Sequence, residues 1–141
     1  SGMAYGIDGM AMSGALTAGA PAVGVLGCGA DIVYPVSNRA LFRDTEEYGC
    51  ILSEFAPGTP PAKWTFPKRN RIISGLSCGV LVVEAPEKSG ALITARLAAE
   101  QGAGRVRGAG KHRPAVLCGE QPASAGRGDH GFLRLGRSER I

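Results

Sequence analysis

The sequence predicts an α/β domain built on a doubly wound, mainly parallel β-sheet. Three short apolar runs, at residues 22–27, 51–55 and 79–85, alternate with segments of helical periodicity. The last run is interrupted only by Glu84, a pattern typical of a parallel strand covered on both faces. Because the connections between these segments are short, each strand is expected to reach the next through a right-handed helical crossover.

Turn and capping residues place the helices between these strands. Asp8 is expected to cap the first helix and Gly19 to end it, while Asn38 and Ser89 are suited to cap later helices. The predicted helices cover residues 9–18, 39–48, 69–77 and 90–101.

The charge of the chain is unevenly distributed. Of the 141 residues, 16 are Lys or Arg and 12 are Asp or Glu, which gives a formal net charge of +4. Eight of the basic and three of the acidic residues fall in 102–141, so residues 1–101 are nearly neutral. Basic character overall is therefore weak evidence for nucleic acid, and anion binding would need local clustering. With neither a membrane-length apolar stretch nor a secretory leader, a cytoplasmic location is expected.

The cysteines and histidines do not form a recognisable catalytic or metal-binding pattern. Cys28, Cys50, Cys78 and Cys118 are widely spaced without a C-x-x-C pair, and both histidines, His112 and His130, follow residue 101. A Ser-His or Cys-His nucleophile pair is thus excluded within residues 1–101. The thiols are expected to be free and packed as small hydrophobes, with no metal site.

Two other chemical patterns also have simpler structural explanations. Gly27-Cys28-Gly29 suggests a dinucleotide-binding turn, but the third glycine position is occupied by Ile32, so no cofactor is expected. Glu54 and Glu84 lie at strand ends, where two carboxylates can converge for acid–base work. The favoured interpretation is that these carboxylates cap loop amides or pair with Arg69 or Arg71, because buried charges are usually paired.

The strongest functional signal is the basic run Lys68-Arg69-Asn70-Arg71 at the start of a predicted helix. Cations there oppose the helix dipole unless an anion joins them, and helix amides and arginine both bind phosphate well. The alternative is a solvated helix start. Trp64 and Phe66 precede the run, and either base stacking or a hydrophobic staple explains an aromatic residue there.

A second loop adds to this signal. Ser89 is a natural N-cap, Gly90 lets a ligand approach the backbone, and Lys88 adds a charge beside them. If both helix N-termini lie near one strand end, they form a phosphate-sized site. The alternative interpretation of Ser89 is a plain helix cap, and the sequence leaves the two open.

Six segments follow one another in the order of a known family. They are SGMAYGID (1–8), GVLGCGAD with VYP (24–35), LSEFAPGTPP (52–61), FPKRNRIISGLS (66–77), GVLVVEA (79–85) and SGALITARLAAEQG (89–102). Together they resemble the DprA/Smf family, the DNA-processing proteins of bacterial natural transformation. The resemblance covers residues 1–102 and implies an extended Rossmann-like, three-layer αβα domain.

The resemblance also implies a function. DprA-like proteins bind single-stranded DNA in a positive pocket, form homodimers and load RecA onto the incoming strand; they are not regarded as enzymes and need no cofactor. By motif, the DNA- or phosphate-binding residues here are Lys68, Arg69, Asn70 and Arg71 (FPxRNR), Ser1 and Gly2 (SGxAxGID), and Ser89 and Gly90 (SGxLxTA).

Some features depart from the family pattern. Met12 stands where a histidine is usual, and neither the strand that precedes SGxAxGID nor an earlier Gly-Ser-Arg phosphate loop lies before Ser1. We therefore expect residues 1–102 to form a partial domain with an incomplete pocket. An alternative is a nucleoside-monophosphate hydrolase of the lysine-decarboxylase-like (LOG) group. Its P-G-G-x-G-T-x-x-E loop is not matched by PEKSGALIT, residues 86–94.

Residues 103–141 do not continue the family pattern, and we predict that they are a disordered tail translated out of frame. The tail is rich in Gly and Arg without helical or alternating periodicity, and nine of the 22 glycines follow Gln101. A one-nucleotide shift over residues 102–112 permits the family-like G-R-D-V-F-A-V-P-G-S. The alternative is a genuine basic tail that binds nucleic acid.

Sequencing the coding DNA tests the frame prediction. The offset frame is expected to be open and to encode A-V-P-G, and the sheet edge that this segment should complete is expected to be left exposed. Stop codons in that frame, or a packed strand at 103–110 beside residues 79–85, contradict the prediction.

Overall fold

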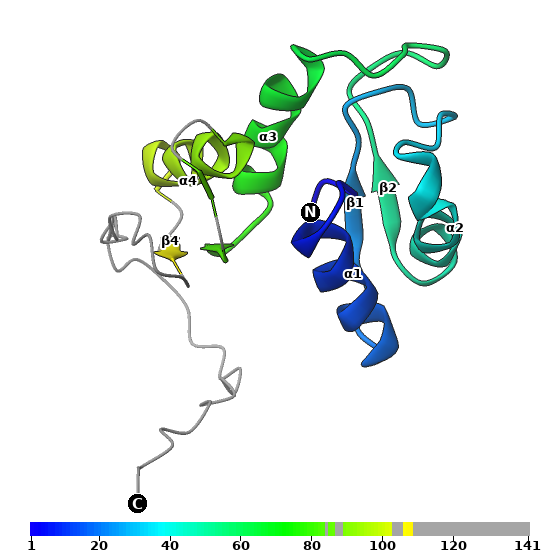
Figure 1. The fold of residues 1–141 in the computed structure, drawn as a ribbon, viewed down its shortest axis with the longest axis horizontal. Helices are drawn as coiled ribbons and strands as arrows, with labels where there is room; N and C mark the ends of the chain where they lie inside the picture. The colour runs from blue at the N-terminus through cyan, green and yellow to red at the C-terminus, as the bar shows by residue number, and fades with distance from the viewer. Residues whose placement is uncertain (84, 87–88, 103–105, 109–141) are drawn as a thin grey trace, which may run out of the picture.

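A computed structural model describes residues 1–83, 85–86, 89–102 and 106–108. Helices and strands alternate along the chain, as the sequence predicts (Figure 1). The N-terminal elements are α1 (Ile7–Thr17), β1 (Val23–Val25), the 3-10 turn η1 (Val36–Asn38), α2 (Arg39–Tyr48) and β2 (Cys50–Leu52). They are followed by α3 (Thr65–Gly75), β3 (Val80–Val82), α4 (Gly90–Glu100) and β4 (Val106–Gly108).

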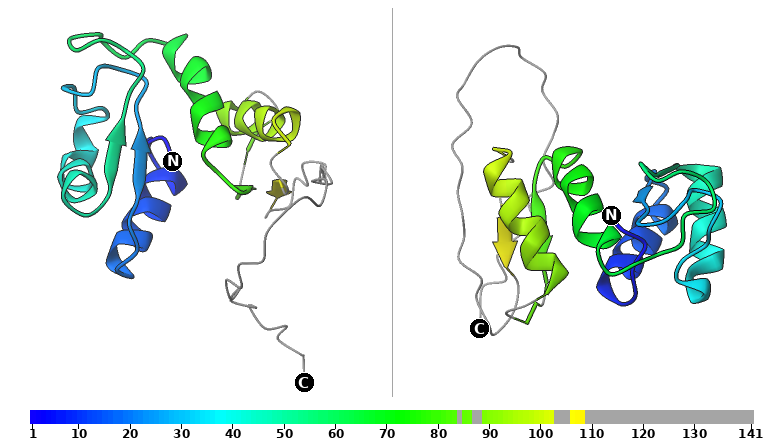
Figure 2. Two further views of the ribbon diagram at one scale, coloured as in Figure 1. Left: turned by 180° about the vertical axis from the view of Figure 1, so that it is seen from behind. Right: turned by 90° about the horizontal axis from the view of Figure 1, so that it is seen from above.

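The strands form two parallel pairs. β1 pairs with β2, with Val23 opposite Cys50, and β3 pairs with β4, with Val80 opposite Val106. Parallel strands joined by helices confirm the predicted α/β, Rossmann-like class. Among the described residues, however, the pairs belong to two separate two-stranded sheets rather than to one. α3 lies between them, in contact with both β1 and α4 (Figures 1 and 2).

Each half has its own hydrophobic core. The buried residues around β1 and its helices are Met3, Met12, Ala22, Leu26, Cys28 and Phe42. Met12, which replaces the family's usual histidine, is therefore a core residue. A smaller core joins Val82 of β3 to Ala95 and Ala98 of α4.

The first residue pairs with β1 as a strand residue does. The Ser1 amine donates to the Val23 carbonyl at 2.7 Å, and the Val25 amide donates to the Ser1 carbonyl at 2.8 Å. A residue that bonds to both neighbours of the residue opposite is the signature of a parallel ladder, here with Gly24 opposite Ser1. This pairing fixes Ser1 and Gly2 beside the end of β1.

The predicted helices match the observed ones closely except at α3. Its first residue is Thr65, four residues before the predicted start at 69. Pro67 therefore lies inside the first turn of the helix. Proline is tolerated there, since the amide it lacks would have no partner within the helix. The run Lys68-Arg69-Asn70-Arg71 therefore follows the helix start by nearly a turn, which weakens the argument from the helix dipole.

Helix capping agrees with the sequence prediction only in part. The Ser89 side chain accepts a hydrogen bond from the Leu92 amide, and Gly19 follows α1 with a positive φ of 77°, both as predicted. Asn38 precedes α2 but donates its side-chain amide to the Met3 carbonyl at 2.9 Å instead of capping. Asp8 as N-cap is wrong: Gly6 holds that position.

Strand β4 falls within residues 103–141, the predicted out-of-frame tail. Because Val106–Gly108 pair with Val80–Val82, the expected open sheet edge beside β3 is wrong over these three residues. A backbone pairing of three residues does not test the reading frame of Val106–Gly108. Residues 109–141, with His112, Cys118 and His130, lie outside the described residues, and for them the frame offset stays a prediction.

The described cysteines are free, as expected, but only Cys28 is packed as a small hydrophobe; Cys50 and Cys78 are exposed. Within the described ranges there is no group of three His, Cys, Asp or Glu able to hold a metal ion. No helix in that part of the chain has the length and apolar character needed to cross a membrane.

Gly49, between α2 and β2, tests the packing of the N-terminal half. A Cβ atom at this position would lie 2.0 Å from the Ala22 carbonyl oxygen. We expect Gly49→Ala to lower the free energy of unfolding by about 1–3 kcal/mol, because backbone must move to relieve the overlap. Urea denaturation measures the change.

Gly14→Ala is the matched control. Gly14 lies within α1 with open space around its Cα, so alanine should raise the free energy of unfolding by about 0.5–1 kcal/mol through helix propensity. Equal effects of the two substitutions would contradict the packing described here.

Candidate functional site

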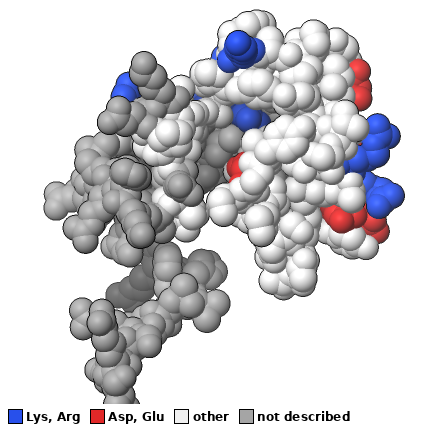
Figure 3. Space-filling view, in the orientation of Figure 1, with Lys and Arg blue, Asp and Glu red and all other residues white. Residues whose placement is uncertain are grey.

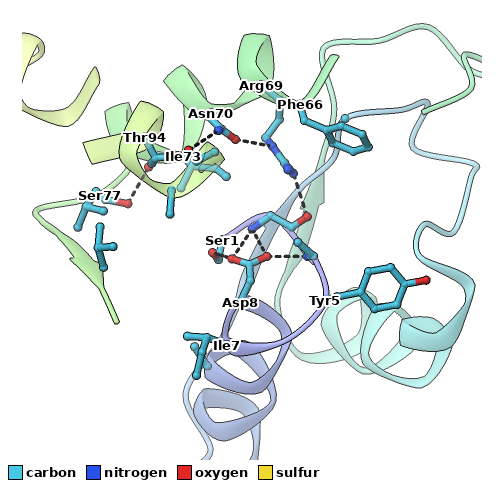
Figure 4. A pocket seen from close by; sticks show the side chains of 18 of the residues that line it. Ser1, Tyr5, Ile7, Asp8, Phe66, Arg69, Asn70, Ile73, Ser77 and Thr94 are labelled. Carbon is cyan, nitrogen blue, oxygen red and sulfur yellow. Dashed lines mark hydrogen bonds between the residues drawn. The ribbon is translucent and has the colours of Figure 1, made fainter. Parts of the chain in front are cut away.

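A cavity of about 830 Å³ separates the two halves of the molecule. Figure 3 shows the hollow from outside, and Figure 4 shows the side chains that line it. The polar part of the wall joins the start of the chain to α3 and α4 and includes Ser1, Gly2, Asp8, Arg69, Asn70 and Thr94. The remaining wall includes apolar residues of α1, α3 and β3, among them Ile7, Ile73 and Leu81.

Arg69 is a buried cation, with 5% of its surface exposed. Its Nη1 donates to the carbonyls of Val25 and Gly2, the latter at 2.9 Å, and its Nε donates to Asn70 Oδ1 at 3.2 Å (Figure 4). Burial lowers the pKa of the guanidinium, and the nearby Asp8 carboxylate partly opposes that shift. Arg69 thus fastens α3 to the end of β1, a structural role that the sequence did not reveal.

Asp8 organises the beginning of the chain. Its carboxylate accepts hydrogen bonds from the Gly2 amide at 3.0 Å, the Ala4 amide at 2.6 Å and the Ser1 hydroxyl. Gly2 must be small here, because a Cβ atom would lie 2.7 Å from Arg69 Nη2. Ser1 and Gly2 therefore lie in the cavity wall, with their polar groups largely satisfied within the protein. Their binding of phosphate stays a prediction.

The N-terminus of α4 meets the second turn of α3. Asn70 Nδ2 and Thr94 Oγ1 both donate to the Gly90 carbonyl, each at 3.3 Å. Gly90 itself is exposed at the cavity, and Ser89 is half-buried beside it. The condition for a phosphate-sized site between two helix N-termini is not met, because α4 begins against Asn70 and not against the start of α3.

The other two cations of the run lie outside the cavity lining. Arg71 Nη2 forms an ion pair with Glu54 Oε2, as the favoured interpretation of Glu54 predicted. Lys68 is exposed, and its Nζ lies 5.3 Å from the centre of the Phe55 ring. Glu84 and Lys88 lie outside the described residues.

The structure distinguishes the two aromatic residues that the sequence could not. Phe66 lines the cavity, stacks on Tyr34 with ring centres 5.7 Å apart and lies under Arg69, so it is a packing residue. Trp64 is 61% exposed and makes an edge-on contact with Phe55 at 5.8 Å.

Sequence reasoning missed three residues. Asp8 has the sequence signature of a helix cap, although an acid six residues after a Ser-Gly turn is also suited to bind the amides of that turn. Tyr34 lines the cavity beside Phe66, and its only sequence signal is its place in the VYP segment. Lys63 is an exposed cation directly before Trp64 and lies outside the FPKRNR motif of residues 66–71.

The family of this chain follows from its similarity to known proteins. Residues 1–108 match the family model described as "DNA recombination-mediator protein A". The chain belongs to this family. The match extends six residues beyond the predicted limit at 102 and includes β4.

Curated relatives support the assignment. The Smf protein of Synechocystis is 53% identical over 100 residues, which cover 71% of this chain and 25% of that protein. A relative from Mycobacterium tuberculosis is 39% identical over 136 residues, 96% of this chain and 33% of its own length, so its alignment extends into the tail. The chain spans about a quarter to a third of the length of these DprA-family relatives.

Two solved DprA structures share the fold. That from Streptococcus pneumoniae has a TM-score of 0.68 and 43% identity, covering 76% of this chain and 38% of that one. That from Helicobacter pylori has a TM-score of 0.69 and 32% identity, covering 76% and 48%. The latter was solved to explain a single-stranded DNA binding mode of the Helicobacter protein.

Arg69 and Arg71 are expected to differ sharply in stability tests. Arg69→Lys keeps the charge but loses the fork that holds two carbonyls and Asn70, and we expect it to lower the free energy of unfolding by roughly 2–4 kcal/mol. Arg71→Lys changes a half-exposed ion pair and should cost at most about 0.5 kcal/mol. Urea denaturation of both variants checks this, and similar losses would show that Arg69 does not hold the two halves together.

Proposed function

We propose that this chain is a single-stranded DNA-binding part of a DprA-type recombination mediator. Membership of the family supports this, as does the likeness to the Helicobacter protein, whose DNA-binding mode has been studied. Because the chain spans only part of its relatives, the proposal concerns the contribution of these residues and not a complete activity.

The observation that carries the proposal is the position of α3. Its FPKRNR segment lies against the end of β1 and the start of α4. One buried cation, Arg69, therefore lines the same cavity as Ser1, Gly2 and Gly90. In the described part of the chain Arg69 is bound by neutral carbonyl and amide oxygens and by no ion pair. The Asp8 carboxylate lines the same cavity and interacts with Arg69, so it offsets part of this charge. We propose that the remaining positive charge attracts phosphate groups to this wall.

Lys68 and Arg71 extend this positive charge to the outer surface of α3. Lys68 is exposed and can reach a phosphate directly, whereas Arg71 must share its guanidinium with Glu54. We propose phosphate contacts for both, with Asn70, Ser89 and Gly90 shaping the wall. Arg69 acts mainly by its field, because its Nη1 and Nε donors are engaged.

The wider role follows the family. We propose that the complete protein is a homodimer in the cytoplasm that protects incoming single-stranded DNA and loads RecA onto it. In this role the protein orders and hands over a strand, and binding rather than covalent chemistry is its task. The arrangement around Arg69, which has hydrogen-bond donors but no histidine among residues 1–102, suits binding of this kind.

A salt titration tests the proposed phosphate contacts. We expect labelled oligothymidine to bind the 141-residue chain more weakly as salt rises, and Lys68→Gln to reduce the slope of log K against log salt by about 0.7. Arg71→Gln should act in the same direction. Fluorescence anisotropy at several salt concentrations gives both affinity and slope.

Arg43→Gln is the matched control, because Arg43 is an exposed cation on α2, away from the cavity. Its affinity and slope should equal those of the unchanged chain. If Lys68→Gln and Arg71→Gln also leave both quantities unchanged, these cations do not touch DNA. If nucleoside monophosphates displace the oligonucleotide at equal phosphate concentration, a mononucleotide site is the better explanation.

A further inference from the structure

Trp64, the only tryptophan of the chain, is held on the surface at the N-cap position of α3. With 61% of its surface exposed, it cannot be a hydrophobic staple, which would bury the ring against the following turn. Its one described aromatic contact is with Phe55, ring centres 5.8 Å apart and planes at 77°. A T-shaped contact of this kind covers at most one face of the indole, so at least one face is left for stacking.

Two exposed lysines lie close to this ring in the chain. Lys68 lies one helical turn after Trp64, with its ammonium 5.3 Å from the centre of the same Phe55 ring, and Lys63 is exposed directly before Trp64. We call Phe55, Lys63, Trp64 and Lys68 the Trp64 patch. None of the four lines the cavity, so the patch is a separate surface.

The acidic residue next to the patch is already paired. Glu54, which precedes Phe55, forms an ion pair with Arg71. The four residues of the patch carry two positive charges, from Lys63 and Lys68, and an exposed indole. An aromatic face flanked by lysines is complementary to a single-stranded nucleic acid, whose bases stack while its phosphates meet the cations.

We propose that Trp64 is a base-stacking platform for single-stranded DNA, with Lys68 holding an adjacent phosphate. This rests on the proposed function and adds a contact outside the cavity. A helix is about 10 Å across, so a strand of a few nucleotides spans α3 from the cavity wall to the patch. The strand follows the start of α3, with phosphates attracted by Arg69 at one end of the path and a base on Trp64 at the other.

The sole tryptophan makes the test direct. The 141-residue chain is titrated with oligothymidine and with an abasic oligonucleotide of equal length and charge, while anisotropy reports binding and tryptophan emission reports stacking. We expect thymine bases to quench the emission and the abasic strand to leave it nearly unchanged. Trp64→Leu should weaken oligothymidine binding about tenfold, with the abasic affinity and the salt slope unaltered.

Two variants serve as controls. Trp64→Phe keeps a stacking face and should recover most of the lost affinity. Tyr48→Leu removes an aromatic ring of similar exposure, 63%, at the end of α2 and should change nothing.

The outcomes separate this inference from the proposed function. If oligothymidine binds with unchanged emission and Trp64→Leu binds as well as the unchanged chain, Trp64 does not stack and the phosphate site stands. If the abasic strand quenches equally, the patch recognises charge alone and the stacking proposal fails. If neither strand binds, the proposed function itself is wrong.

Discussion

The guanidinium of Arg69 is the interaction on which the arrangement of this molecule depends. Its hydrogen bonds to the carbonyls of Val25 and Gly2 connect α3 to the β1 half, while α3 packs along α4 in the other half. Among the described residues no strand pairing joins the two halves, so α3 is the structural link between them. A planar, permanently charged donor is well suited to this task, because one side chain satisfies carbonyl groups from separate segments.

The three cations of the basic run have different contacts and exposures because neighbouring residues of a helix point in different directions. Arg69 points inward to the end of β1, Arg71 reaches Glu54, and Lys68 remains on the surface over Phe55. A count of charges treats these residues as equivalent. Their positions around α3 give them different roles. Arg69 holds segments of the structure together, Arg71 shares its charge with Glu54, and only Lys68 is fully open to a ligand.

Local signals allowed the helices to be predicted well, and long-range contacts explain the errors. Ser89 and Gly19 act on their own helix ends, so the sequence around them suffices. Asp8 has the composition of a cap, but its carboxylate is taken by amides of the chain start, which only the folded structure brings near. The contacts of Arg69, Phe66 and Trp64 likewise depend on Val25 of β1 and on the loop residues Tyr34 and Phe55. These partners lie 9 to 44 residues away in the sequence, too far for local pattern or propensity to predict the contacts.

The cavity has two walls of different chemistry, and this limits what it can bind as a DNA site. Leu81, which is 64% exposed, and Ile73 belong to an apolar wall that offers phosphate neither charge nor donors. The polar wall around Arg69, with Ser1, Gly2 and Gly90, is better suited to phosphate than the apolar wall. A strand is therefore expected to follow the polar rim toward the start of α3, where the exposed cation and the exposed indole lie, and not to fill the hollow between the two halves.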